Sequence, residues 1–188
     1  MLSKTGPAGN ESAQPNGKDH PMFRLEPMDE ATYLAWRLAS QRDYADEKVE
    51  AGNWKAEDAE RLSREAFDAL LPEGRATPGH EIRAMVSDGE KVGHAWWTIE
   101  NREAGRVAFI YDIAVDPDHR RRGYARSALA EIEAWASEHG CAGVMLHVFG
   151  YNTPARELYR SVGFEETNVM MLKRVTSGVT PEASAARR

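Results

Sequence analysis

The sequence predicts a mixed α/β fold in which helices flank a central, mostly antiparallel sheet. Residues 107–115 are rich in β-branched and aromatic side chains, which favours a buried strand, and Asp116-Pro117 ends it. After Gly123 the apolar residues recur every three or four positions, which predicts an amphipathic helix. The Asp88-Gly89 pair between two strand-like segments predicts a β-hairpin.

The remaining elements follow from the same kind of local signal. Asp29 has a side chain that helix N-termini prefer, so we expect a first strand at Phe23–Pro27 to lead into a helix there. Apolar residues along one side predict a second helix at about 56–71. The full expected order is a strand at 23–27, two helices, three antiparallel strands at 81–86, 91–100 and 107–115, a helix after Gly123, a strand at 144–148, a helix at 152–163 and a last strand near 169–173.

The composition is that of a globular protein with one domain. The chain has 188 residues, of which 41% are hydrophobic and 29% charged. Residues 1–21 and 175–188 lack a hydrophobic period, so we expect both ends to be disordered and the domain to cover 22–174.

Charge, hydropathy and cysteine content exclude several classes of protein. The net charge of -6 argues against nucleic acid as the main partner. No apolar run is long enough to span a bilayer, and the first residues lack the apolar segment of a secretion signal, so we expect a cytoplasmic protein without a membrane partner. Cys141 is the only cysteine, which excludes an internal disulfide and a cysteine metal cluster; we expect no metal.

A basic segment lies between the strand at 107–115 and the helix after it. Gly123 stands at the N-terminus of that helix, where backbone amides without internal partners bind anions, and a glycine lets the anion approach closely. Taken alone, the arginines would indicate only a solvated basic patch. Neither the G-x-x-x-x-G-K-[ST] loop nor the G-x-G-x-x-G fingerprint is present. The segment is therefore a candidate phosphate-binding turn of another kind.

A second motif occupies residues 152–164 and carries its own start and stop signals. Asn152 is a good N-cap, Pro154 fits the first turn and Gly163 suits the end of a short helix. Tyr159 falls on the apolar side of this helix. An isolated tyrosine there would be a core aromatic; its pairing with the candidate phosphate turn favours a functional role.

The two motifs together resemble the GNAT superfamily of acyl-CoA-dependent N-acetyltransferases. In that family a strand end like Ile113-Ala114-Val115 precedes (Arg/Gln)-x-x-Gly-x-(Gly/Ala), which Arg120-Arg121-Arg122-Gly123-Tyr124-Ala125 matches. The family pattern Asn-x-x-Ala-x-x-Leu-Tyr, followed by Gly-Phe, is matched by Asn152, Ala155, Leu158, Tyr159, Gly163 and Phe164. The resemblance covers residues 109–173, and the weaker first half from about residue 23 also fits.

The resemblance implies a sheet whose central strands splay and an acetyl-CoA site between them. It assigns cofactor binding to the strand end and the turn, namely Ile113, Ala114, Val115, Arg120, Arg121, Arg122, Gly123, Tyr124, Ala125 and Arg126, together with Asn152. It also implies that Tyr159 donates a proton to the leaving sulfur, for which a phenol with a normal pKa near 10 is suited at neutral pH.

The base that deprotonates the acceptor amine is left open between three residues. Some protein N-terminal acetyltransferases of this superfamily carry a glutamate five residues before the motif asparagine, and that position here is His147. A histidine can accept a proton at neutral pH directly or through water, although His147 could equally be a hydrogen-bonded core residue. Asp112 and Glu100 are the alternatives.

We therefore expect direct transfer of an acetyl group from acetyl-CoA to a primary amine of a small molecule or peptide. Residues 41–74 include ten acidic and five basic residues, which could attract a cationic amine or form a solvated face. Trp96 and Trp97 must point to opposite faces of their strand. We expect one of them to fill the core and the other to line the acceptor pocket. Transfer of another acyl group and a coenzyme A-binding sensor without turnover are the alternatives, and the resemblance leaves a homodimer open.

Overall fold

The computed structural model describes residues 22–103 and 105–173. It divides after Tyr151 into two units, of which the described parts are 22–151 and 152–173, and each is considered by itself. The expected disordered segments, 1–21 and 175–188, lie outside the described residues, and the single domain over 22–174 stays a prediction.

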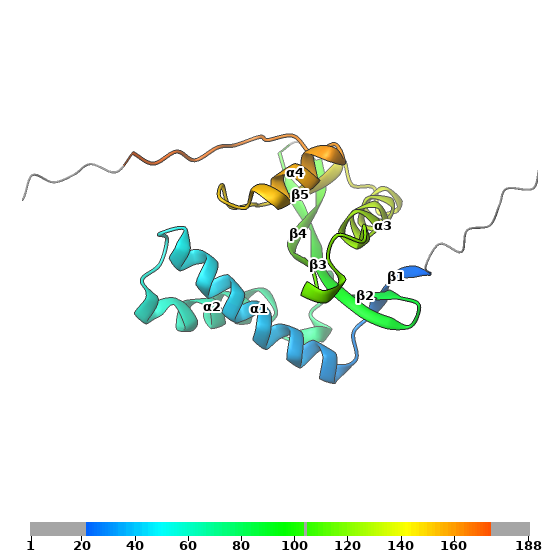
Figure 1. The fold of residues 1–188 in the computed structure, drawn as a ribbon, viewed down its shortest axis with the longest axis horizontal. Coiled ribbons are helices and arrows are strands. Elements are labelled where there is room, and N and C mark those ends of the chain that lie inside the picture. The colour runs from blue at the N-terminus through cyan, green and yellow to red at the C-terminus, as the bar shows by residue number, and fades with distance from the viewer. Residues whose placement is uncertain (1–21, 104, 174–188) are drawn as a thin grey trace, which may run out of the picture. The chain divides into compact units, whose positions relative to one another are not determined.

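A five-stranded sheet forms the centre of the first unit (Figure 1). The spatial order follows the chain: β1 (Phe23–Pro27), β2 (His80–Ser87), β3 (Glu90–Arg102), β4 (Gly105–Val115) and β5 (Gly143–Leu146). The first four strands pair antiparallel, and β5 pairs parallel to β4. Asp88 and Gly89 both have positive φ angles, 52° and 82°, as a type I′ hairpin turn requires. The predicted fold class is confirmed.

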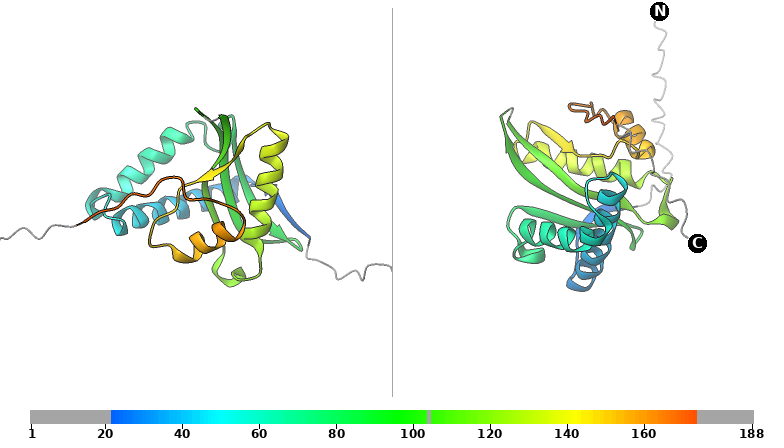
Figure 2. Two further views of the ribbon diagram at one scale, coloured as in Figure 1. Left: turned by 90° about the horizontal axis from the view of Figure 1, so that it is seen from above. Right: turned by 90° about the vertical axis from the view of Figure 1, so that its left-hand side faces the viewer.

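Helices cover the two faces of this sheet (Figure 2). Helices α1 (Glu30–Glu50) and α2 (Ala56–Leu70) lie on one face, and α3 (Tyr124–Glu138) lies on the other. The Asp29 side chain accepts a hydrogen bond from the Thr32 amide at 2.7 Å, so the predicted N-cap of α1 is confirmed. Two short 3₁₀ turns, η1 (Gly74–Ala76) and η2 (Pro117–His119), complete the unit.

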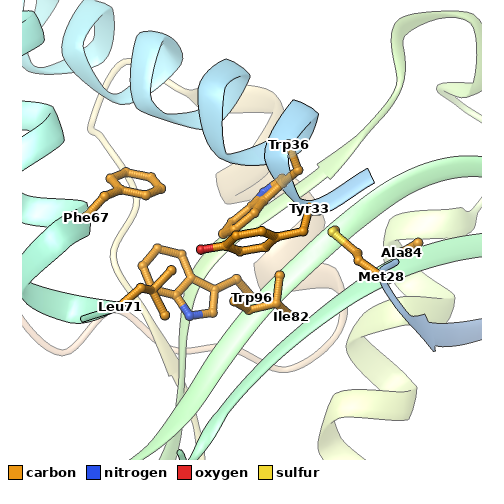
Figure 3. Packing of buried hydrophobic residues seen from close by; sticks show 8 residues of the cluster. All are labelled: Met28, Tyr33, Trp36, Phe67, Leu71, Ile82, Ala84 and Trp96. Carbon is orange, nitrogen blue, oxygen red and sulfur yellow. The ribbon is translucent and has the colours of Figure 1, made fainter. Parts of the chain in front are cut away.

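An aromatic core holds α1 and α2 against the sheet (Figure 3). The rings of Trp36, Phe67 and Trp96 contact one another, with centroids 5.4–6.2 Å apart. Trp97 points to the opposite face, where its ring meets Trp135 of α3 at 5.6 Å. Both tryptophans of the Trp96-Trp97 pair are only 2% exposed. The alternation was predicted correctly, but the expectation that one of them faces an acceptor is wrong, because each face of the sheet is covered by helices at this position.

A β-bulge interrupts β4 near the point where it leaves β5. Trp96 pairs with Asp112 while the next residue, Trp97, pairs with Ile110, so Tyr111 is the extra residue. Pairing between β4 and β5 covers only 107–110 opposite 143–146. The strands therefore diverge just where β4 is kinked, and β5 is shorter than the predicted 144–148.

The close approach of β3 and β4 depends on Gly93. A Cβ atom at this position would lie 2.4 Å from the Ala114 carbonyl oxygen and 2.9 Å from the Met85 sulfur. We expect Gly93→Ala to reduce the free energy of unfolding by about 1–3 kcal/mol, because the backbone of β4 has to move. Gly143→Ala is the control, since no atom lies within 4 Å of its added methyl group; chemical denaturation that finds equal stability for both variants would contradict this reading.

The second unit contains the short helix α4 (Thr153–Ser161). Asn152 caps it, accepting a hydrogen bond from the Ala155 amide at 3.3 Å, and Pro154 lies in its first turn, as predicted. The predicted last strand near 169–173 is wrong, because residues 164–173 form no strand. Val169, Met170, Met171 and Leu172 are 68–95% exposed, so the apolar composition of this segment does not by itself make it a strand.

Candidate active site

The end of β4 exposes backbone groups on the side that β5 has left. The Asp116 amide donates to the Val92 carbonyl on β3 at 2.9 Å. Because the backbone groups of successive strand residues point to alternate edges, those of Ile113 and Val115 face away from β3. Arg120 supports this assignment, since its Nε donates to the Val115 carbonyl at 3.2 Å. The Ala114 carbonyl faces β3, next to Gly93.

A turn with two left-handed residues connects this strand end to α3. Arg121 and Gly123 have φ angles of 64° and 90°, and Gly123 is the N-cap of the helix. The first backbone bond of α3 runs from the Ser127 amide to the Gly123 carbonyl at 3.1 Å, so the amides of Tyr124 and Ala125 have no acceptor within the helix. No atom lies within 4 Å of the place where a Gly123 side chain would begin. An anion could therefore approach these amides closely.

The predicted cofactor residues fall into two groups in the structure. Ile113, Val115 and the segment 120–126 follow one another along the strand end and the turn of the first unit. Asn152 and Tyr159 belong to the second unit, where the Tyr159 ring packs against Phe164 with centroids 5.6 Å apart. Their roles toward a cofactor stay predictions.

Asp112 is the centre of a buried polar network. Its Oδ2 accepts hydrogen bonds from Trp36 Nε1 at 3.0 Å and Ser40 Oγ at 2.7 Å, and His94 Nε2 lies 3.1 Å away. Burial alone would raise the pKa of Asp112, but the hydrogen bonds and the adjacent imidazole lower it below its ordinary value. A carboxylate held ionised by these groups is a poor proton acceptor, so the network tethers α1 to the bulge rather than offering a base.

Glu100, the second candidate base, is also engaged. It accepts a hydrogen bond from the Tyr111 hydroxyl at 2.8 Å and pairs with Arg102. Burial, with the Glu100 contact, raises the pKa of Tyr111 to about 12. The Tyr111 ring stacks on Trp96 with centroids 4.7 Å apart, so Glu100 helps fix the bulge residue.

His147, the third candidate, lies beyond the end of β5 and is exposed. Its ring contacts Phe149 edge-on, with centroids 5.1 Å apart, and Phe149 stacks on Tyr151. An exposed imidazole with this single ring contact is accessible to a ligand. The expectation that His147 accepts the amine proton stays a prediction.

The cluster at the C-terminal end of α1 was not predicted from the sequence. The Lys48 ammonium lies 5.1 Å from the Tyr44 ring, 5.6 Å from Trp54 and 5.8 Å from Phe149, so it ties the segment after β5 to α1. Glu47 beside it is half-buried. The missed signal was spacing: Glu47 follows Ser40 by seven residues, which places a carboxylate on the sheet-facing side of α1.

Two absences concern the described part of the chain alone. No three His, Cys, Asp or Glu side chains there gather in a way that could hold a metal ion. Within residues 22–103 and 105–173, no helix combines the length and the apolar character that crossing a membrane requires.

Comparison with known proteins agrees with this geometry. Residues 33–164 match the family described as "Acetyltransferase (GNAT) family". A Bacillus subtilis (strain 168) protein named "Uncharacterized N-acetyltransferase YycN" is 38% identical over 152 residues, which are 80% of this chain and 97% of that protein. The crystal structure of the putative acetyltransferase YycN from Bacillus subtilis has a TM-score of 0.77 at 37% identity and covers 83% of this chain and 100% of its own.

A more distant structure has the same fold. The aminoglycoside N-acetyltransferase AAC(6')-Iy, in complex with CoA, has a TM-score of 0.53 at 20% identity, covering 88% of this chain and 100% of its own. The strand end, the glycine turn and the family match over 132 residues lead to one conclusion. The chain belongs to the GNAT acetyltransferase family.

Proposed function

We propose that this protein transfers an acetyl group from acetyl-CoA directly to a primary amine of a small molecule or peptide. The observation that carries the proposal is that β4 pairs with β5 only as far as Ile110, and that its remaining residues lead directly into the turn at Gly123 and the first turn of α3. An extended amide chain can pair with Ile113 and Val115 as a further strand would. A pyrophosphate can bind at the amides after Gly123. Acetyl-CoA contains both groups in one molecule.

The residues of the turn fit this co-substrate chemically. The absence of a side chain at Gly123 leaves the amides of Tyr124 and Ala125 accessible. Arg121, Arg122 and Arg126 are exposed and supply positive charge around them. Arg120 contributes by holding the Val115 carbonyl, and its effect on affinity should be small. The CoA complex of the related fold AAC(6')-Iy supports the choice of coenzyme A over another phosphate ligand.

Two protons have to move during the reaction. The acceptor ammonium must lose a proton before its nitrogen can attack, and the departing thiolate must gain one. The match of Tyr159 to the family motif supports it as the acid for the thiolate. Asn152 is proposed to act near the cofactor through its position at the start of α4.

The proposal is tested by measuring free thiol release with acetyl-CoA and a panel of peptides, polyamines and aminoglycosides. We expect release that depends on one class of amine, with an acetylated product of matching amount. Binding of acetyl-CoA without transfer to any amine would contradict the proposal and favour a coenzyme A sensor. Faster turnover with another acyl-CoA would show that a different acyl group is transferred, while the proposed type of reaction would stand.

Substitution of Gly123 tests the cofactor turn separately. We expect Gly123→Val to weaken acetyl-CoA binding at least tenfold, about 1.4 kcal/mol, because its side chain occupies the space that the pyrophosphate needs. Gly140→Val is the matched control, since Gly140 also has a positive φ angle, 68°, and no atom within 4 Å of its added Cβ atom. Both variants should lose similar stability from backbone strain, about 1–2 kcal/mol. Calorimetry that finds equal affinity in the two variants would exclude this turn as the pyrophosphate site.

A further inference from the structure

Glu47 lies on the face of α1 that looks toward the diverging strands. Ser40, two helical turns before it, donates a hydrogen bond to Asp112 at the bulge of β4. The charge of Glu47 acts on Asp112 and also on the phenol of Tyr151, which follows β5. Glu47 is therefore close both to β4 and to the segment after β5, where the two strands have separated.

Glu47 differs from Asp112 and Glu100, the two carboxylates considered above, because its own carboxylate is not engaged. Asp112 accepts from Trp36 and Ser40, and Glu100 accepts from Tyr111 and pairs with Arg102. Within the described residues the Glu47 side-chain carboxylate accepts no hydrogen bond and forms no ion pair, although the residue is half-buried; only its backbone carbonyl is engaged, by the Ala51 amide at 2.9 Å.

The charges around Glu47 favour its protonated form. Burial raises its pKa, and the carboxylates of Asp112, Asp43 and Glu50 raise it further, with Asp112 contributing from β4. The neighbouring Lys48 ammonium lowers it in part, but that ammonium is held among the rings of Tyr44, Trp54 and Phe149. A carboxylate whose pKa moves toward neutrality is a more effective proton acceptor at neutral pH.

We propose that Glu47 is the general base that deprotonates the acceptor ammonium, an assignment that rests on the proposed acetyl transfer. One proton passes from the ammonium to a carboxylate oxygen of Glu47, which later releases it to water. The nitrogen lone pair then forms the N–C bond as the C–S bond breaks. The nitrogen loses a second proton as the amide forms, and the departing thiolate takes up one proton, so that no net charge is left on either product. The acceptor class that fits is an amine that is protonated at neutral pH.

The test compares Glu47→Gln with Asp46→Asn. Asp46 is an exposed residue on the same helix, and its substitution removes the same charge. With an acceptor found in the thiol assay, we expect Glu47→Gln to lower kcat/KM for the amine by about 10²- to 10⁴-fold at neutral pH. The loss should shrink as the pH rises, because more of the amine is already neutral. Asp46→Asn should stay within threefold of wild type, roughly the scatter among surface changes.

Two further readouts separate a base from a structural residue. Acetyl-CoA affinity should be the same in wild type and Glu47→Gln, and the thermal midpoint should not fall, because the variant removes a carboxylate from a region that disfavours its charge. If the wild-type enzyme is active and Glu47→Gln leaves its pH profile unchanged, the role of Glu47 is overturned and the proposed acetyl transfer stands. A wild-type protein that transfers to no amine would overturn the proposed function and Glu47's role with it.

Discussion

Replacing Tyr159 by phenylalanine is expected to reduce turnover by about 10²- to 10⁴-fold, the usual contribution of a positioned general acid, when thiolate departure limits the rate. The substitution removes only the hydroxyl. The ring contact with Phe164, at 5.6 Å, can persist, so stability and acetyl-CoA affinity should change little. Steady-state kinetics with a confirmed acceptor, combined with calorimetry of acetyl-CoA binding, measures both quantities on one variant.

Tyr33→Phe provides the control for loss of a tyrosine hydroxyl. Tyr33 of α1 is 2% exposed and lies in the aromatic core, where its hydroxyl accepts a hydrogen bond from Arg37 at 3.1 Å. We expect this variant to lose some stability and to keep its turnover. Undiminished acetyl transfer in a well-folded Tyr159→Phe variant would make Tyr159 a packing residue and leave the leaving thiolate without the acid assigned to it.

Asp112→Ala should produce the largest loss of stability of the variants considered, about 3–5 kcal/mol in the free energy of unfolding. The variant leaves the Trp36 indole and the Ser40 hydroxyl without their acceptor, and these residues are only 4% and 6% exposed. It also removes the partner of His94. Because the network connects α1, β3 and β4, its loss should loosen the bulge as well as the helix.

Asp116→Ala is the matched control, an aspartate that directly follows the last residue of the same strand. Asp116 pairs with Lys91 at 2.8 Å, and both side chains are more than a third exposed, so we expect a loss below about 1 kcal/mol. Urea denaturation that gives similar losses for both aspartates would contradict the structural role of Asp112.

The lowered pKa of Asp112 also predicts how the difference in stability between wild type and Asp112→Ala depends on pH. A carboxylate with a lowered pKa in the folded state stabilises that state above its unfolded pKa, about 4, and the contribution disappears as the pH falls through the folded value. The stability gap between wild type and Asp112→Ala should therefore be full at neutral pH and narrow below about pH 4.

The elements that were predicted correctly are those specified by neighbouring residues. Asp29 and Asn152 cap the helices that follow them, and Asp88-Gly89 forms the turn of the hairpin. The order of five strands and four helices could be predicted for the same reason, since periodicity and turn residues act over a few positions. The glycine turn was visible because its motif is contiguous.

What could not be predicted depends on residues far apart in the chain. The bulge at Tyr111 is visible only from the pairing of the neighbouring strand, in which Trp96 lies opposite Asp112 and Trp97 lies opposite Ile110. The polar network joins Asp112 to Trp36 and Ser40, 76 and 72 positions away, so the sequence left Asp112 open as a base. The prediction of a strand near 169–173 was wrong for a related reason. Composition favours a strand there, but a strand forms only by pairing with another segment, and local sequence does not specify that partner.

The proposed function requires acetyl-CoA to bind along the edge of β4 beyond Ile110, and amide hydrogen exchange followed by NMR tests this binding most directly. On addition of acetyl-CoA, the amides of Ile113 and Val115 should exchange much more slowly, because they gain acceptors from the bound molecule. The amide of Asp116, already bonded to Val92 on β3, should change little. Saturation with acetyl-CoA that leaves Ile113 and Val115 exchanging as in the free protein would contradict the account.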